Sequence, residues 1–356
     1  MIRLLAAAML LGTPLAAQAR HVIFVTIDGV RAEDLFGGAD PTIMADAKGA
    51  GIEDTAAFRA RWWRESPIAR RRAMMPFLWD TLVPMGVLFG EGDGVRVTNG
   101  LQFSGPGYTE LFTGAPRADV TSNADVRHPH PTLFEVLARE PGRAATDIAA
   151  FTSWTTQARI ADSRGGTFTA QAPFDPLPAA LRDDPRLVRL HEIEQRVHHD
   201  DTSIRYDAFT HEMALAWLTR FHPVLLHVGY GETDVEAHAR HYDRYIAMLH
   251  STDRMLSELW HAAQADPALA GTTALVVTTD HGRGATSRDW TDHGRNVTNA
   301  THWWFLAAGA GVTPRGAVSD PMVQAQTAPT ILRLLGRGVA GLELPVAKAV
   351  DLVPTR

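Results

Sequence analysis

Short apolar runs alternate with longer amphipathic stretches along most of the chain, and this order constrains the fold more than any other feature. The runs expected to form strands are 21–27, 95–99, 144–151, 224–230, 272–279 and 302–309. The stretches expected to form helices are 131–140, 206–221, 237–264 and 327–336. Alternating strands and helices predict an α/β protein in which helices sandwich a doubly wound, mostly parallel sheet.

Two segments, 38–90 and 160–200, fit this alternation less well. We interpret them as insertions in a single metallohydrolase-like domain over 20–356, placed where they can shape or cover a site. The first insertion carries a cluster of six arginines: Arg59, Arg61, Arg64, Arg70, Arg71 and Arg72. A solvated helix face is the interpretation we favour for this cluster over a binding patch.

The N-terminus has the layout of a secretory signal peptide over residues 1–19. Arg3 precedes an apolar run that ends in the small-residue pattern Ala17-Gln18-Ala19, which predicts cleavage after Ala19. The apolar run is shorter than the roughly 20 residues that a membrane span requires. The sequence therefore predicts a periplasmic or secreted protein with no membrane span.

Composition limits the chemistry that a site can use. The 356 residues are 45% hydrophobic, which is enough for a large core, and include no cysteine. Any metal ion must therefore be held by His, Asp and Glu. The formal net charge of -6 gives no reason to expect a nucleic-acid partner.

Carboxylates stand just beyond three of the expected strands. Asp28, Asp234 and Asp280 each follow a different strand within four residues of its end. One such residue alone is most often a turn or cap residue. Three of them after three strands would meet at one edge of a parallel sheet, where ligand sites form. The coincidence indicates a functional site.

Histidines extend this set toward a metal centre. His238 lies four residues after Asp234, on the same side of a helical turn, and His281 directly follows Asp280. The two histidines and three carboxylates are too few for two ions, so a later histidine is expected to complete the set. His293 and His302 are the candidates. We prefer His293, because a residue that heads a strand points away from the carboxyl edge.

His and Asp ligands suit zinc, and manganese accepts them too. Three carboxylates against two divalent ions leave a net charge of about +1, which suits an anionic phosphoryl group. The expected cofactors are thus two divalent metal ions, with Zn²⁺ preferred to Mn²⁺. The expected partner is a small-molecule phosphate ester. The sequence does not indicate the oligomeric state.

Ser104 is the candidate nucleophile. It follows the 95–99 run and precedes a tight turn of Gly105, Pro106 and Gly107, with Pro106 suited to the first turn of a helix. A hydroxyl at that place lies where free N–H groups and the helix dipole favour an anion.

The chain resembles the alkaline phosphatase superfamily of binuclear metalloenzymes, and in particular its nucleotide pyrophosphatase/phosphodiesterase-like branch. The matching stretches, in the family's order from residue 22 to about 336, are VIFVTIDGVR, VTNGLQFSGPGYTELFTG, GYGETDVEAHARHYD, VVTTDHGRG, the HG at His293 and QTAPTILRLLG. Each stretch alone is only suggestive, whereas the ordered set is specific.

The resemblance assigns roles to these residues. It implies that one zinc is bound by Asp28, Asp280 and His281 and also meets the Ser104 oxygen. It implies that the other is bound by Asp234, His238 and His293. The family's phosphate-contacting Asn has its nearest match in Asn123, about two residues early, and the diesterase branch commonly has Thr where this chain has Ser104. The implied activity is hydrolysis of phosphate esters through a phosphoseryl intermediate.

Three alternatives stay open at this point. The residues do not separate a phosphatase from a phosphodiesterase or nucleotide pyrophosphatase. A sulfatase is disfavoured, because the family's sulfatase motif has Arg where this chain has Tyr108 and the chain has no Cys. A non-catalytic metal-binding module is disfavoured, because none of the six implied ligands is missing.

Overall fold

Strand β1 (His21–Ile27) lies at the centre of an eight-stranded sheet in the computed structural model, which describes residues 18–92 and 94–353. The other strands, in their order across the sheet, are β5 (Thr169–Gln171), β4 (Ile148–Thr152) and β6 (Leu225–Tyr230) on one side of β1, and β7 (Thr273–Thr278), β8 (Phe305–Gly309), β2 (Gly86–Phe89) and β9 (Gly316–Val318) on the other. All neighbours pair in parallel except β8, which is antiparallel to both β7 and β2. The predicted mostly parallel α/β fold is confirmed.

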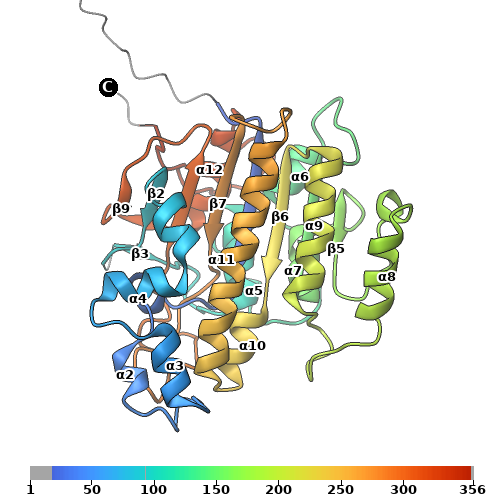
Figure 1. The fold of residues 1–356 in the computed structure, drawn as a ribbon. Helices are drawn as coiled ribbons and strands as arrows, with labels where there is room; N and C mark the ends of the chain where they lie inside the picture. Colours follow the sequence, from blue (N-terminus) through green and yellow to red (C-terminus); the bar gives the residue numbers. More distant parts are fainter. Residues whose placement is uncertain (1–17, 93, 354–356) are drawn as a thin grey trace, which may run out of the picture.

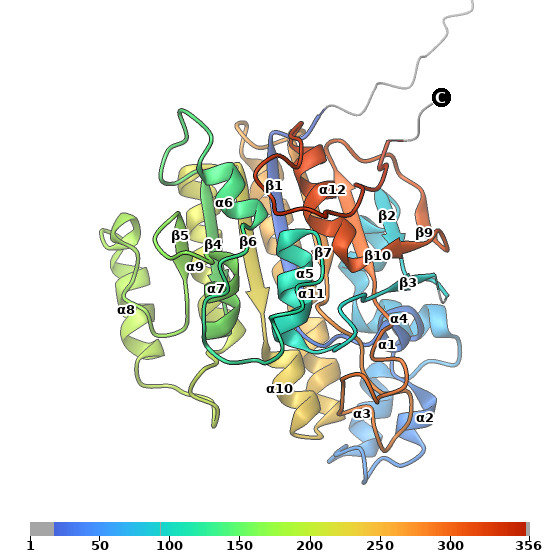
Figure 2. The same cartoon turned by 180° about the vertical axis from the view of Figure 1, so that it is seen from behind.

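Helices cover both faces of this sheet (Figures 1 and 2). On the face toward the viewer in Figure 1 lie α9 (Asp207–Phe221) and α11 (Tyr242–Ala265), with α4 (Pro67–Met74) beside them. On the face toward the viewer in Figure 2 lie α5 (Ser104–Thr113), α6 (Leu133–Ala138), α7 (Thr155–Ala161) and α12 (Thr327–Leu334).

Shorter elements complete the fold. The remaining α-helices are α1 (Ala32–Gly37), α2 (Pro41–Met44), α3 (Thr55–Trp62), α8 (Pro185–Glu194) and α10 (Glu232–His238). A π-helical turn spans Leu78–Leu82, and 3₁₀ turns span Ala179–Leu181 and Gln324–Gln326. Strands β3 (Val95–Arg96) and β10 (Met322–Val323) form a separate two-stranded sheet.

Alternate residues of β1 supply the two cores. Ile23 and Val25 belong to the cluster that includes side chains of α9 and α11, whereas Val22 and Phe24 belong to the cluster that includes side chains of α5 and α6. Both faces of β1 are therefore apolar, as expected for a strand with helices on either side. Burying each such side chain stabilises the fold by about 1.5–3 kcal/mol.

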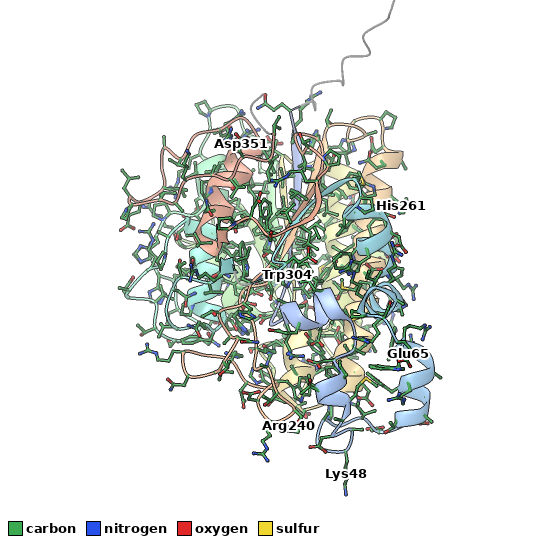
Figure 3. The ribbon with its side chains drawn as sticks, turned by 90° about the vertical axis from the view of Figure 1, so that its left-hand side faces the viewer. Lys48, Glu65, Arg240, His261, Trp304 and Asp351 are labelled. Atoms are coloured by element: carbon green, nitrogen blue, oxygen red, sulfur yellow. The ribbon has the colours of Figure 1, made fainter. Side chains whose placement is uncertain are left out.

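The register of β1 fixes where the site lies. Ile27 pairs with Tyr230 of β6, and Thr26 pairs with Thr278 of β7, so the three strands end at the same level. In Figure 1 the strands point downward, so this common edge faces the lower part of the picture, where α10 begins. Figure 3 shows Arg240 and Lys48 projecting from the same end, while Trp304 lies in the interior.

Two of the predicted elements differ in the structure. The 95–99 run forms only the two-residue β3, and beyond it the backbone N–H of Thr98 donates to the buried Glu110 of α5 instead of to a strand. The 237–264 stretch contains the end of α10 and most of α11, with a break at Arg240, whose φ is 60°. The backbone of Tyr242 then donates to Ala50, outside the helix.

The two expected insertions contain strands of the main sheet. Strand β2 lies in 38–90 and β5 lies in 160–200. In the arginine cluster of the first segment, four members are exposed but Arg70 is buried, where it donates to the carbonyl oxygen of Gly37 and lies over the Trp63 ring. The prediction of a solvated face therefore fails for Arg70.

Residues 1–17 of the predicted signal peptide lie outside the described residues, so export stays a prediction. Ala19, the residue before the expected cleavage point, is buried. Among the residues that the structure describes, no helix has the length and apolarity needed to cross a membrane.

Candidate metal centre

The ends of the three central strands bring together the side chains that the sequence singled out. Asp28 follows β1, and Asp280 and His281 follow β7. Asp234 and His238 lie on α10, the short helix that begins directly beyond β6. This convergence follows from the parallel order of the strands, whose carboxyl ends open at one edge.

The first group consists of Asp28, Asp280 and His281, all of them buried. Each offers one ligand atom within 4.8 Å of the other two. His281 Nε2 lies 3.5 Å from Asp28 Oδ1 and 3.3 Å from Asp280 Oδ2. One imidazole nitrogen thus faces two carboxylate oxygens, a donor set that suits a divalent ion.

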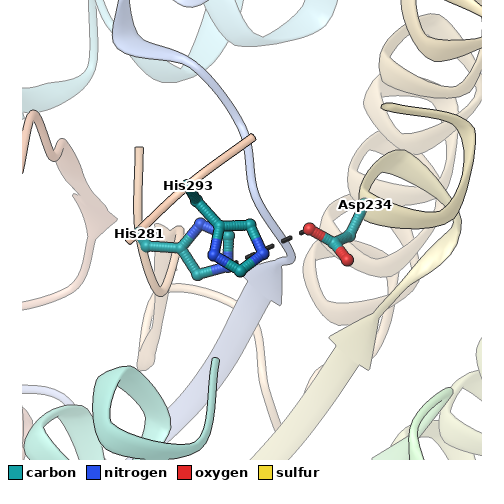
Figure 4. Close-up of side chains that lie close together, drawn as sticks. All are labelled: Asp234, His281 and His293. Atoms are coloured by element: carbon teal, nitrogen blue, oxygen red, sulfur yellow. Dashed lines mark ion pairs between the residues drawn. The ribbon is translucent and has the colours of Figure 1, made fainter. Parts of the chain in front are cut away.

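The second group adjoins the first (Figure 4). Asp234, His281 and His293 also offer ligand atoms within 4.8 Å of one another. His238 Nε2 lies 3.2 Å from Asp234 Oδ2 and 3.0 Å from His293 Nε2. His281 therefore belongs to both groups, and His293, the histidine that we preferred from the sequence, lies within ligand distance of Asp234 and His281.

The burial and the pKa shifts of these carboxylates and imidazoles favour a bound cation. Burial raises the pKa of Asp28 to about 8, with a further rise from the charge of Asp280, and burial raises the pKa of Asp280 to about 7. Burial lowers the pKa of His281 and His293. Asp28 Oδ1 and Asp280 Oδ2 are buried and have no hydrogen-bond partner in the described part of the chain. Divalent ions fit these residues, because they would compensate the buried carboxylates and bind the neutral imidazoles.

Several neighbours fix the ligands in place. The Tyr108 hydroxyl donates to Asp28 Oδ2 at 3.0 Å, and the Thr233 hydroxyl donates to the Asp28 carbonyl at 2.6 Å. The Gly29 N–H donates to Asp280 Oδ1 at 3.0 Å. Such contacts around a metal ligand set its orientation and basicity.

Arg283 is a member of this centre that the sequence reasoning missed. Its side chain is fully buried, its Nε donates to the Gly29 carbonyl at 2.8 Å, and its Nη2 forms an ion pair with Asp234 Oδ1. Burial lowers the pKa of Arg283 to about 9, so the guanidinium still carries its charge at neutral pH. The signal that could have found it is its position in the stretch Asp280-His281-Gly282-Arg283.

Ser104 is the first residue of α5, and its Oγ lies 3.3 Å from His281 Nε2. Close contacts explain the two glycines that follow it. A Cβ on Gly105 would lie 2.4 Å from the Ser122 carbonyl oxygen, and one on Gly107 would lie 2.5 Å from the Asp280 carbonyl oxygen. Gly107 therefore lets the first turn of α5 lie against Asp280 of the first group, and Gly105 lets it lie against Ser122.

Asn123 lies beside the nucleophile candidate. Its Oδ1 accepts a hydrogen bond from the Gly105 N–H at 2.7 Å, and its carbonyl accepts one from the Thr156 hydroxyl at 3.3 Å. The asparagine is exposed, so its side chain adjoins both the first turn of α5 and solvent.

The prediction that His302 points away from the carboxyl edge is wrong. Because β8 runs antiparallel to β7, the residues before β8 lie at the same edge as Asp280 and not at the far edge. His302 nevertheless belongs to neither group. Its Nδ1 lies 2.9 Å from Glu33 Oε1 instead.

No family model matches the chain, and neither does any curated protein. Solved structures do share its fold. A 2-O GAG sulfatase is 16% identical, with a TM-score of 0.55 over 94% of this chain and 73% of that one. A phosphonate monoester hydrolase of Agrobacterium radiobacter is 16% identical, with a TM-score of 0.56 over 89% and 74%.

A protein of the alkaline phosphatase superfamily from Vibrio parahaemolyticus is 11% identical, with a TM-score of 0.52 over 93% of this chain and 72% of that one. The chain thus has the α/β fold of these proteins. At such identities the likeness describes the fold and does not single out the phosphodiesterase-like branch.

Proposed function

We propose that the protein is a metal-dependent hydrolase of phosphate esters that uses Ser104 as its nucleophile. The observation that carries the proposal is the position of Ser104 Oγ, at the start of α5 and 3.3 Å from His281 Nε2, against two groups of Asp and His ligands. A nucleophile beside two cation sites is the arrangement that in-line displacement at phosphorus requires.

In this proposal the ligands divide as the family resemblance implies, with His281 assigned to the first ion although it belongs to both groups of neighbouring side chains. Asp28, Asp280 and His281 would hold one divalent ion, and Asp234, His238 and His293 would hold the other. Bound there, the ions would lower the pKa of a nearby hydroxyl and stabilise charge on a leaving oxygen. Zinc is the ion we propose, since imidazoles and carboxylates suit it and the family resemblance favours it over manganese, which accepts the same ligands.

The chain's own residues carry the two displacements. Ser104 Oγ loses its proton and bonds to phosphorus while the bond to the alcohol oxygen breaks, and the alcohol leaves after taking up a proton. Water then attacks the phosphoseryl phosphorus, which releases inorganic phosphate and returns the hydroxyl to Ser104. Asn123 and the first turn of α5 contact the phosphoryl oxygens in this proposal.

Phosphate monoesters are the substrates we favour over diesters. Two divalent ions and three carboxylates sum to about +1, and the buried Arg283 raises the sum to about +2, which matches a dianionic monoester. A sulfatase of the formylglycine type is disfavoured, because this chain has Tyr108 at the position where that motif has Arg. The Tyr108 hydroxyl donates a hydrogen bond to the Asp28 carboxylate.

Purified full-length protein loaded with zinc tests the proposal. We expect it to hydrolyse p-nitrophenyl phosphate faster than bis-p-nitrophenyl phosphate and to leave p-nitrophenyl sulfate intact. We expect Ser104→Ala to keep its metal content and lose nearly all turnover. Retained turnover in Ser104→Ala would refute Ser104 as the nucleophile. A parent protein that binds metal but hydrolyses none of the esters would favour a metal-binding module without catalysis.

A further inference from the structure

A cavity of about 550 Å³ opens directly beside the second ligand group, and nothing in the hydrolysis described above uses it. Asp234 and His238 form part of its wall, so it shares two side chains with the candidate centre. Its volume is in the range of small-molecule sites, about 300–1,000 Å³. If the phosphoryl group is held at the centre, this cavity is free to hold the rest of the ester.

Another part of the wall comes from the connection between α8 and α9. Four consecutive residues of that connection, His198, His199, Asp200 and Asp201, line the cavity together with Tyr206. The His199 ring packs on the Tyr206 ring with 3.8 Å between centroids, which holds an inner residue of the connection against its last residue. This wall therefore contains both aromatic rings and carboxylates.

The charges of the cavity are predominantly negative. Asp200, Asp201 and Glu236 line it in addition to the candidate ligands, and Arg244 is the one guanidinium among the described lining residues. Arg244 also reaches Glu53, 3.3 Å away, which offsets part of its charge. Carboxylates that face a shared cavity attract a cation and repel an anion.

We propose that this cavity, here called the alcohol pocket, binds the alcohol part of the substrate and selects alcohols that carry an ammonium group. The inference rests on the proposed phosphate ester hydrolysis, which it deepens by naming the class of leaving group. Asp200 and Asp201 supply the charge complementarity, and Tyr206 supplies an aromatic wall of the kind that favours ammonium groups. Alcohols that carry an anionic group, such as a carboxylate, are selected against.

A pair of substrates of equal shape tests the selection. Phosphocholine carries a quaternary ammonium, and 3,3-dimethylbutyl phosphate replaces its nitrogen by carbon. Because the two alcohols differ as leaving groups, the measurement is the ratio of their kcat/KM values in each protein. We expect the double variant Asp200→Asn, Asp201→Asn to lower the ratio of phosphocholine to its neutral isostere at least about fivefold, since only the cation loses an attraction.

Glu192→Gln is the matched control. Glu192 is an exposed carboxylate of α8 outside the cavity, paired with Arg189 at 2.8 Å, and its variant is expected to keep the parent ratio. An unchanged ratio in the double variant would overturn the alcohol pocket while leaving the proposed function in place.

Binding separates the two hypotheses if no ester is hydrolysed. Calorimetric titration of the full-length protein with choline, and separately with 3,3-dimethylbutanol, reports on the pocket without turnover. We expect choline to bind more tightly than the neutral alcohol, and this preference to be lost in the double variant. Equal or absent binding of the two would refute the alcohol pocket, whereas preserved selectivity without hydrolysis would refute only the proposed function.

Discussion

Arg283 and Asp234 form an ion pair at the candidate metal centre, in which a fully buried guanidinium contacts a carboxylate that is largely shielded from solvent. The arginine comes from the segment after β7, and the aspartate comes from the helix after β6. The contact therefore ties two strand ends together across β1 and adds one fixed positive charge beside the ligands.

The first prediction concerns this charge. Arg283→Gln should lower kcat/KM for p-nitrophenyl phosphate about tenfold more than for bis-p-nitrophenyl phosphate, equivalent to about 1.4 kcal/mol, because only the monoester carries the second negative charge. Steady-state kinetics with both substrates measure this change. Arg220→Gln, which breaks a surface pair with Asp183, is the control and should leave the ratio unaltered. An equal loss on both substrates would show that Arg283 only holds Asp234 in place.

The second prediction concerns Tyr108 as a positioning residue. Tyr108→Phe removes the hydroxyl that donates to Asp28 Oδ2 and keeps the buried ring. We expect zinc affinity, measured by competition with a chelator, to fall about 10–100-fold, as for other groups that orient a metal ligand. Tyr245→Phe is the control, because that hydroxyl is also buried but accepts from the Arg31 N–H. Unchanged affinity in Tyr108→Phe would refute the positioning role.

The sequence located the site because parallel strands carry their ends to one edge. Asp28, Asp234 and Asp280 could be placed together from their positions after apolar runs alone. The direction of β8 could not, since an apolar run has the same pattern whichever way it crosses the sheet. The prediction that strand direction places His302 away from the carboxyl edge is therefore wrong, because β8 pairs antiparallel with β7.

Other features were missed because they depend on long-range contacts. Arg283 gives no periodic signal, and its role arises only where it meets Asp234. The break between α10 and α11 falls inside an unbroken helical pattern, and the 95–99 run is diverted by hydrogen bonds to Glu110. The hydrophobic pattern of the sequence shows which residues are apolar. These features depend instead on which distant residue forms the hydrogen bond or ion pair.

The third prediction concerns the close approach of α5 to Asp280. Gly107→Ala would place a Cβ 2.5 Å from the Asp280 carbonyl oxygen, so the helix or the ligand must shift. We expect a loss of about 1–3 kcal/mol in the free energy of unfolding and a large loss of turnover. Urea unfolding and p-nitrophenyl phosphate kinetics measure the two effects.

Gly37→Ala is the matched control for this substitution. Gly37 is also in a helix, and a Cβ there would meet nothing within 4 Å. We expect unchanged turnover and a stability gain of about 0.4–1 kcal/mol from reduced freedom of the unfolded chain. If Gly107→Ala behaves like this control, the close approach does not constrain the site.

The last prediction concerns the buried His227 of β6. Its Nδ1 donates to the Phe24 carbonyl at 3.0 Å, its Nε2 faces the Gln157 amide at 3.2 Å, and burial lowers its pKa to about 3. Between about pH 6.5 and 3 the unfolded state binds the proton that the folded state excludes, so the free energy of unfolding falls as pH falls, by at most about 1.4 kcal/mol per unit from this group. His227→Gln should remove that part of the slope in urea unfolding of metal-free protein between pH 7 and 4.5. Equal slopes for the variant and the parent would contradict the assignment.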